Sequence, residues 1–231
     1  MKPIATMIFA AGLGTRMGEL TRSRPKPLIE VAGKPLIAHA LNIARGADVD
    51  RIVVNTHAHA AQMHAWLEAH APECLISHEP ELLETGGGLT KALPLLDTQV
   101  AYTLNADMVW NGENPMRKLA EAWDARRMDA LLCLVPRGKA VGHAGRGDFF
   151  LDPFDRVSRR GDAAFAPFVY SGCQILKLDI LQELPPRSFS LNTVWDQMLA
   201  RGRVSGAVFD GTWIDVGRPE GIALAEAEAV R

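Results

Sequence analysis

Apolar runs alternate with helically spaced apolar positions along the first part of the chain. Residues 4–10 are mostly apolar, include β-branched side chains and stop at Gly12, which predicts a strand buried on both faces, as in a parallel sheet. Residues 35–44 open with a proline and then place apolar side chains at helical spacing, which predicts a helix. The same criteria predict strands at 51–56, 74–77, 100–105 and 130–135 and helices at 60–70 and 116–126.

Strands that alternate with helices in this way form βαβ units, so the expected fold class is α/β. We expect a Rossmann-like, mostly parallel central sheet flanked by helices. After Arg137 the rhythm changes, because residues 138–147 contain four glycines and residues 149–158 alternate like an antiparallel hairpin. This segment predicts a small β-rich insertion. A strand at 169–176, a helix at 193–201, a strand at 204–209 and a helix at 220–230 follow, and we expect one single domain over residues 1–231.

Composition removes several classes of partner. The chain has 25 Lys plus Arg against 27 Asp plus Glu, for a net charge of −2, and therefore lacks the basic excess typical of proteins that bind nucleic acid or an anionic membrane. The cysteines number three and none forms a C-x-x-C pair, so free, buried thiols are expected. The N-terminal apolar stretch is short for a signal peptide, which predicts a cytoplasmic protein.

A glycine-containing loop follows the first expected strand. Residues 10–17 read A-A-G-L-G-T-R-M, at the carboxyl end of a strand, where open α/β sheets bind their ligands. Glycines allow backbone N–H groups to turn toward an anion. The loop is neither a Walker A motif nor G-x-G-x-x-G, because Met17 occupies the third glycine position. By itself this loop is equally compatible with a tight structural turn.

Two cations accompany this loop. Arg16 lies within it, and Lys26 follows in the segment R-P-K-P-L. The prolines on either side of Lys26 restrict its backbone, which predicts an exposed lysine held in one position.

Two aspartates lie at the ends of expected strands. Asp107 follows the strand at 100–105, and Asp215 lies in W-I-D-V-G near the end of the chain. Carboxylates of this kind suit Mg²⁺ when phosphates supply most of the other ligands, although either one alone could cap a turn or a helix. A further segment, E-T-G-G-G at 84–88, precedes a helical pattern. It suits close contact with a base or ribose. A flexible loop is an equally good interpretation of the same residues.

Together these motifs resemble those of the sugar-1-phosphate nucleotidyltransferases. The resemblance implies that Arg16, Lys26 and Asp107 are catalytic, with Arg16 acting on the departing pyrophosphate. It implies that Asp107 and Asp215 hold Mg²⁺. It also implies a set of nucleotide-binding residues, namely Ala11, Gly12, Gly14, Thr15, Arg16, Lys26, Glu79, Glu84, Thr85 and Gly86. Two departures from the family pattern are G-E-L at 18–20 and Ala106 in place of a glycine.

The segment G-H-A-G-R-G-D-F at 142–149 resembles one group of this family, the N-acetylmuramate α-1-phosphate uridylyltransferases of cell-wall sugar recycling. The resemblance covers essentially the whole chain. It implies a nucleoside triphosphate and a sugar 1-phosphate as substrates, with the sugar near Asn105, Gly147 and Asp148 and with Arg146 facing a sugar carboxylate. Without the resemblance, residues 146–148 read as a hairpin turn.

Other interpretations stay open at this point. Mannose-1-phosphate guanylyltransferases and phosphocholine cytidylyltransferases share the same core. A non-catalytic nucleotide-sensing module is a third possibility, although such a module would usually have lost the lysine or a metal aspartate. His57, His59 and His64 are loosely compatible with zinc, but solvated or capping histidines are more common. The sequence gives no interpretation of Arg218 and no oligomeric state.

Overall fold

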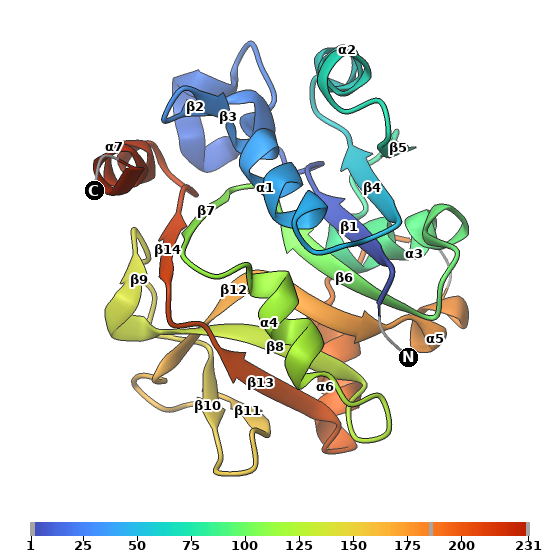
Figure 1. Ribbon diagram of the computed structural model, residues 1–231, viewed down its shortest axis with the longest axis vertical. Coiled ribbons are helices and arrows are strands. Elements are labelled where there is room, and N and C mark those ends of the chain that lie inside the picture. The colour runs from blue at the N-terminus through green and yellow to red at the C-terminus, as the bar shows by residue number, and fades with distance from the viewer. Residues whose placement is uncertain (1–2, 185–186, 230–231) are drawn as a thin grey trace.

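The computed structural model describes residues 3–184 and 187–229, and a sheet with a parallel first half lies at its centre (Figure 1). β1 (Ala5–Phe9) lies between β4 (Arg51–Thr56) and β6 (Val100–Asn105), and β5 (Leu75–His78) pairs with β4 at the edge. These pairings are all parallel. The carboxyl ends of the strands therefore meet at one edge of the sheet, as the sequence predicts.

Helices cover both faces of this sheet. Because side chains alternate along a strand, Ile8 and Met7 of β1 enter different hydrophobic clusters on opposite faces. The elements that pack on the Ile8 face are α1 (Leu36–Arg45), α2 (Ala60–His70) and α4 (Pro115–Ala122). Those on the Met7 face are α3 (Glu84–Leu96), α5 (Asp179–Gln182) and α6 (Asn192–Ala200). Burying each large aliphatic side chain in these clusters contributes about 1.5–3 kcal/mol.

The second half of the sheet is mixed. β12 (Phe168–Lys177) runs antiparallel to both β6 and β8 (Ala130–Pro136), and β13 (Val204–Val208) pairs parallel with β8. The hairpin of β10 (Phe149–Leu151) and β11 (Val157–Arg159) extends the sheet beyond β12. This hairpin confirms the predicted β-rich insertion.

β12 contains a bulge that faces the ligand-binding edge. The pairing register of β12 with β8 shifts between Tyr170 and Gln174, and Gly172 in this interval has φ +84°. A Cβ at Gly172 would lie 2.9 Å from the side chain of Asn105. The bulge therefore lets the backbone of β12 approach the end of β6 closely, as bulges beside active sites often do.

A small second sheet joins distant parts of the chain at the same edge. β14 (Thr212–Asp215) is antiparallel to β7 (Met108–Asn111) and parallel to β9 (Ala140–Val141) (Figure 1). Asp215 pairs with Met108, and Val216 N–H donates to the carbonyl of Asp107 at 3.1 Å. This pairing places the two candidate metal aspartates side by side. The remaining elements are the hairpin of β2 (Glu30–Val31) and β3 (Lys34–Pro35) and the helix α7 (Pro219–Ala229).

Two expectations need adjustment, and one extends beyond the described residues. The helix predicted at 116–126 ends at Ala122, because Trp123 adopts extended backbone angles. Cys133 and Cys173 are buried free thiols as expected, but Cys74 is only half-buried. Val230, the last residue of the predicted C-terminal helix, lies outside the described residues. Among the described residues, no helix combines the length and apolarity needed to span a membrane.

Candidate active site

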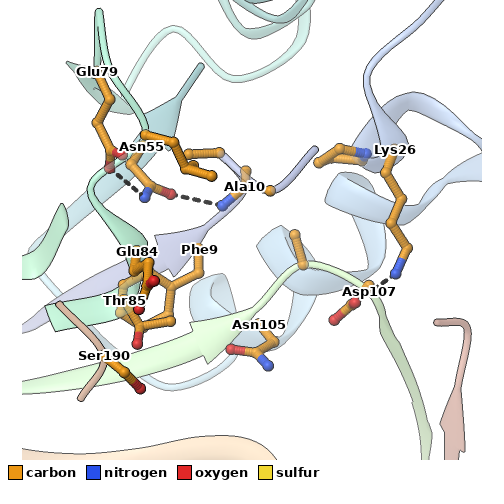
Figure 2. A pocket seen from close by; sticks show the side chains of 15 residues that line it. Phe9, Ala10, Lys26, Asn55, Glu79, Glu84, Thr85, Asn105, Asp107 and Ser190 are labelled. Carbon is orange, nitrogen blue, oxygen red and sulfur yellow. Dashed lines mark hydrogen bonds and ion pairs between the residues drawn. The ribbon is translucent and has the colours of Figure 1, made fainter. Parts of the chain in front are cut away.

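A buried polar chain fixes the backbone just after β1. Ala10 N–H donates to Asn55 Oδ1 at 2.7 Å, and Asn55 Nδ2 donates to Glu79 Oε1 at 2.7 Å (Figure 2). The other Glu79 oxygen accepts from Leu83 N–H at 3.0 Å. Glu79 is fully buried, so its carboxylate depends on these donors. Three segments that lie far apart in the sequence are thereby held around one end of the cleft.

The glycine loop folds tightly onto Lys26. Gly14 has φ +65°, a left-handed conformation that favours glycine. A Cβ at this position would lie 2.9 Å from Cβ of Lys26 and from Cγ2 of Thr21. A short 3₁₀ helix, Thr15–Thr21, follows and begins with Met17 N–H donating to the carbonyl of Gly14 at 2.8 Å.

Lys26 and Asp107 form an ion pair at the centre of the site. Lys26 Nζ lies 2.5 Å from Asp107 Oδ2, with side-chain exposures of 9% and 23% (Figure 2). The expectation that Lys26 is exposed is therefore wrong. Pro25 and Pro27 do restrict the backbone, but the 3₁₀ turn Lys26–Leu28 directs the lysine inward. An ammonium held in a partly dry cleft interacts more strongly with an anion than one in bulk water.

Asp215 lies next to this pair. Gly217 N–H donates to its Oδ1 at 2.7 Å, and His143 Nδ1 lies 3.8 Å from its Oδ2, which is an ion-pair contact rather than a short hydrogen bond. Burial raises the pKa of this carboxyl. The opposing interactions with His143, Gly217 N–H and the charge on Lys26 outweigh burial and bring the pKa below its ordinary value. Two carboxylates and one ammonium thus converge.

These donors fit a magnesium ion that is shared with substrate. Asp107 and Asp215 supply hard carboxylate oxygens, the donors that Mg²⁺ prefers. Within the described part of the chain, no group of three or more His, Cys, Asp or Glu side chains is arranged to hold a metal. The described residues alone therefore do not form a complete cage. Two carboxylates with room for phosphates and water match the usual mode of Mg²⁺ binding in nucleotide enzymes.

Three adjoining cavities form a cleft across the carboxyl ends of β1, β4 and β6. The central cavity has a volume of about 380 Å³. A second cavity, of about 270 Å³, is lined by residues 12–16 of the glycine loop, and we call it the phosphate-loop cavity. It shares Gly12, Lys26 and Asp107 with the central cavity. The hairpin cavity, of about 330 Å³, shares Phe9, Thr85, Asn105 and Ser190 with it. Cavities of this size accommodate parts of a ligand such as a nucleotide or a sugar.

Most of the predicted nucleotide-binding residues line this cleft. Those in the central cavity are Ala11, Gly12, Lys26, Glu79, Glu84 and Thr85. Those in the phosphate-loop cavity are Gly12, Gly14, Thr15, Arg16 and Lys26. Gly86 is buried beneath the cleft rather than lining it.

The triple glycine makes its close contacts with another part of the chain. Gly86 and Gly87 N–H both donate to the carbonyl of Phe189, at 2.8 and 3.2 Å. A Cβ at Gly87 would lie 2.1 Å from the carbonyl oxygen of Arg187. Leu191 N–H donates to Thr85 Oγ1 at 3.0 Å. The glycines therefore admit segment 187–191, which brings Ser190 into the cleft.

The hairpin cavity contains part of the predicted sugar site. Asn105 and Asp148 line it, and Asp148 Oδ2 accepts from Tyr170 N–H at 2.9 Å. Gly147, with φ +80°, backs onto Ala166, where a Cβ would lie 2.1 Å from the carbonyl oxygen. Arg146 is exposed and its side chain is not among those lining the three cavities. A different cation, Arg159, lines the hairpin cavity.

The candidate zinc histidines have separate partners. His57 Nδ1 bonds to the carbonyl of Glu79 at 2.8 Å, His59 Nε2 to that of Thr21 at 3.2 Å, and His64 Nε2 to Thr56 Oγ1 at 2.9 Å. These contacts give each histidine a role in holding the local backbone or a neighbouring hydroxyl.

Sequence reasoning missed Asn55, Ser190 and Arg159. Asn55 lies near the carboxyl end of β4, and the strand-end criterion that selected Asp107 after β6 would also have found it. Ser190 and Arg159 carry no comparable signal, because only tertiary packing brings them to the cleft.

A glycine loop, a buried lysine and two carboxylates at the carboxyl edge of the parallel half of the sheet are the arrangement expected of an enzyme that acts on the phosphates of a nucleotide. Comparison with known proteins agrees. Residues 6–176 match the family described as "MobA-like NTP transferase domain". The chain belongs to this family of nucleotidyltransferases.

Two relatives match over almost their full length. The chain is 40% identical to an N-acetylmuramate α-1-phosphate uridylyltransferase of Caulobacter vibrioides, over 97% of this chain and 96% of that protein. It is 32% identical to the protein of the same name from Neisseria meningitidis serogroup B, with the same coverage of 97% and 96%. The fold is also that of a putative glucose-1-phosphate thymidylyltransferase from Bacillus anthracis, with a TM-score of 0.82, 16% identity and coverage of 97% and 94%.

Proposed function

We propose that this protein transfers a uridylyl group from UTP to N-acetylmuramic acid α-1-phosphate, releasing pyrophosphate, in peptidoglycan recycling. The convergence of Lys26, Asp107 and Asp215 beside the glycine loop carries the proposal of nucleotidyl transfer. The names of the relatives from C. vibrioides and N. meningitidis support the choice of UTP and of the muramic sugar. We propose that residues 1–231 act as one domain in the cytoplasm, where nucleoside triphosphates are supplied.

The reaction needs no protein nucleophile. An oxygen of the sugar phosphate attacks the α-phosphorus in line, and the bond to pyrophosphate breaks. Catalysis then rests on positioning and on stabilising negative charge. Lys26 would oppose charge on the phosphates being joined, and Arg16, which lines the phosphate-loop cavity, would oppose charge on the departing pyrophosphate. Backbone N–H groups of residues 11–14 would add fixed donors.

Asp107 and Asp215 would hold Mg²⁺. When bound, this ion would supply positive charge that neutralises the reacting phosphates. Lys26 contacts the Asp107 carboxylate in this structure. For the proposed role, its ammonium would have to turn from Asp107 toward the phosphates in the reacting complex. His143 and Gly217 hold Asp215 on its other side and limit its rotation.

We propose a division of the cleft between the two substrates. The base and ribose would occupy the central cavity near Glu79, Glu84, Thr85 and Gly86. The sugar would occupy the hairpin cavity, near Asn105, Gly147 and Asp148. This arrangement is supported by the shared lining residues, because the central cavity adjoins both the phosphate-loop cavity, at Lys26 and Asp107, and the hairpin cavity, at Asn105.

A pyrophosphate-release screen tests the proposal directly. The four nucleoside triphosphates are combined with a panel of sugar 1-phosphates that includes N-acetylmuramic acid, N-acetylglucosamine and mannose 1-phosphates, and with phosphocholine. The expected result is the highest kcat/KM with UTP and the muramic sugar. Preference for GTP with mannose 1-phosphate would replace the assignment. Absence of pyrophosphate from every combination, in protein that binds nucleotide, would indicate a sensing module.

A further inference from the structure

A cation of the insertion hairpin faces the proposed sugar cavity. Arg159, the last residue of β11, pairs with Phe149 of β10, and both line the hairpin cavity. Residues that pair directly across two strands project their side chains from the same face. Among the described residues that line this cavity, Arg159 is the only one with a positive charge.

Arg159 is held in place from behind. Its Nε donates to Asp196 Oδ1 at 2.6 Å, its Nη1 to Asn192 Oδ1 at 3.0 Å, and its Nη2 to the carbonyl of Asn192 at 3.2 Å. These contacts fasten the hairpin to the start of α6. The guanidinium carbon also lies 5.7 Å from the ring centre of Phe149 and 5.9 Å from that of Trp195. A side chain restrained in this way has already lost much of the rotamer freedom that binding would cost.

The restraints leave donors available for a ligand. A guanidinium has five N–H donors, and three are used by Asp196 and Asn192, so two remain. The side chain of Arg159 is 36% exposed, whereas that of Asp196 is 61% exposed. Water screens the more exposed carboxylate, which weakens the attraction between Asp196 and Arg159.

The rest of the cavity suits a sugar. Tyr170 and Trp195 meet edge to face at 4.8 Å and offer an apolar wall for methyl groups. Asp148 and Asn105 offer polar atoms for hydroxyl groups. The neighbouring Arg160 directs its Nε and Nη1 to backbone carbonyls of residues 147, 161 and 163.

We propose that Arg159 is the specificity-determining residue of the sugar site, and that its guanidinium binds a carboxylate on the sugar 1-phosphate. This inference rests on the proposed function and refines it, because it assigns to Arg159 the recognition that the sequence resemblance places on Arg146. The carboxylate would accept hydrogen bonds from the two remaining N–H groups. A charge-assisted pair of this kind depends on geometry and therefore favours a sugar that carries the carboxylate.

The test compares kcat/KM for two sugars with UTP, namely N-acetylmuramic acid 1-phosphate and N-acetylglucosamine 1-phosphate, which lacks the carboxylate. Wild type, Arg159→Gln, Arg159→Lys, Arg146→Ala and the control Arg156→Gln are measured. Arg156 lies on the same hairpin, pairs with Asp152 at 2.8 Å and does not line the cavity. Thermal unfolding is recorded for each variant.

Arg159→Gln is expected to reduce the preference for the acidic sugar about ten- to a hundredfold, mainly through KM. The loss of a hydrogen bond to a charged group typically changes kcat/KM by about this factor. Arg159→Lys should give an intermediate ratio, because it keeps the charge and loses the fork, and it serves as the test if the glutamine variant does not fold. Arg156→Gln should keep the wild-type ratio.

Two results would overturn the role of Arg159. One is an equal loss on both sugars in Arg159→Gln and Arg159→Lys, which indicates only a structural clamp on α6. The other is a wild-type ratio in these variants together with loss of the preference in Arg146→Ala. A wild-type enzyme that uses both sugars equally would instead overturn the muramic sugar as the substrate.

Discussion

The ammonium of Lys26 lies 2.5 Å from the carboxylate of Asp107, although the two residues are 81 positions apart in the chain. One comes from the turn after the glycine loop, and the other from the connection between β6 and β7. The proposed reaction uses the ammonium for phosphate oxygens and the carboxylate for Mg²⁺. In this structure each group compensates the charge of the other. We therefore expect the loss of either group to affect stability as well as the proposed reaction.

The substitution Lys26→Ala is expected to lower both the activity and the stability of the protein. We expect kcat to fall at least about a hundredfold, because charge stabilisation in such sites is worth several kcal/mol. The free energy of unfolding should fall by about 1–3 kcal/mol, because Asp107 is left partly buried without its partner. Urea denaturation measures the second effect.

A double-mutant cycle separates this pair from general disruption. The double variant Lys26→Ala, Asp107→Ala should be destabilised by less than the sum of the single variants, with a coupling of about 0.5–3 kcal/mol. Strictly additive losses would show that the ion pair contributes nothing to folding.

Metal dependence follows from the carboxylate pair. EDTA should abolish turnover, and Mg²⁺ or Mn²⁺ should restore it. Asp107→Asn should lower kcat at least about a hundredfold and weaken Mn²⁺ binding in the presence of UTP, measured by electron paramagnetic resonance. Asp210→Asn is the matched control, because Asp210 is 77% exposed and pairs with Lys118, at 3.3 Å, at the surface. Full turnover in chelator would contradict the metal assignment.

The parallel half of the sheet could be predicted because local patterns determine it. The strands β1, β4 and β6 are short apolar runs, and their polar ends mark the ligand-binding edge. The glycine loop and Asp107 were found by this rule, and Asp215 by its position after the last predicted strand. The resemblance to a known family then added their expected roles.

What sequence could not give depends on long-range packing. The prolines beside Lys26 indicate a fixed backbone, but not that the side chain turns inward to Asp107. The glycines at 86–88 indicate a close approach, and only the fold shows that segment 187–191 approaches Gly86 and Gly87 while Glu79 approaches Gly88. Arg159 reaches the cleft because a hairpin docks on α6, and no local motif reports this contact.

Asp129 should make stability depend on pH. Its Oδ1 accepts from Lys177 Nζ at 2.9 Å and from Arg203 Nε at 2.8 Å, which joins the ends of β8, β12 and β13. Burial raises the pKa of this carboxyl, but the bonds from Arg203 and Lys177 and their charges outweigh burial and lower the pKa below its ordinary value of 3.8. Stability from this group is therefore present above pH 4 and is lost as the pH falls through the folded-state pKa.

Asp129→Asn should accordingly lower the free energy of unfolding by about 1–3 kcal/mol at pH 7. The difference from wild type should shrink as the pH falls below about 4, which urea denaturation at a series of pH values will show. Asp48→Asn, whose side chain is 86% exposed and pairs with Arg117, should cost less than about 0.5 kcal/mol. Equal costs for the two variants, or a pH-independent cost for Asp129→Asn, would contradict the assignment.

The contact between Gly87 and segment 187–191 gives a test that links fold and site. The Cβ of Gly87→Ala would lie 2.1 Å from the backbone oxygen of Arg187, which cannot rotate away as a side chain can. The segment must therefore move, and the 3.2 Å bond from Gly87 N–H to the carbonyl of Phe189 must lengthen. Overpacking of this kind typically costs about 1–3 kcal/mol of stability.

Because the same segment carries Ser190 and is tied to Thr85, both of which line the central cavity, its displacement should also raise KM for the nucleoside triphosphate severalfold. The measurement pairs thermal unfolding with steady-state kinetics at saturating sugar 1-phosphate. Gly138→Ala is the matched control, since no atom lies within 4 Å of its Cβ position and Gly138 does not line the central cavity. A Gly87→Ala protein with wild-type melting temperature and KM would contradict this prediction. It would mean that segment 187–191 can move without a cost in stability, and that its packing against the glycines does not affect the nucleotide site.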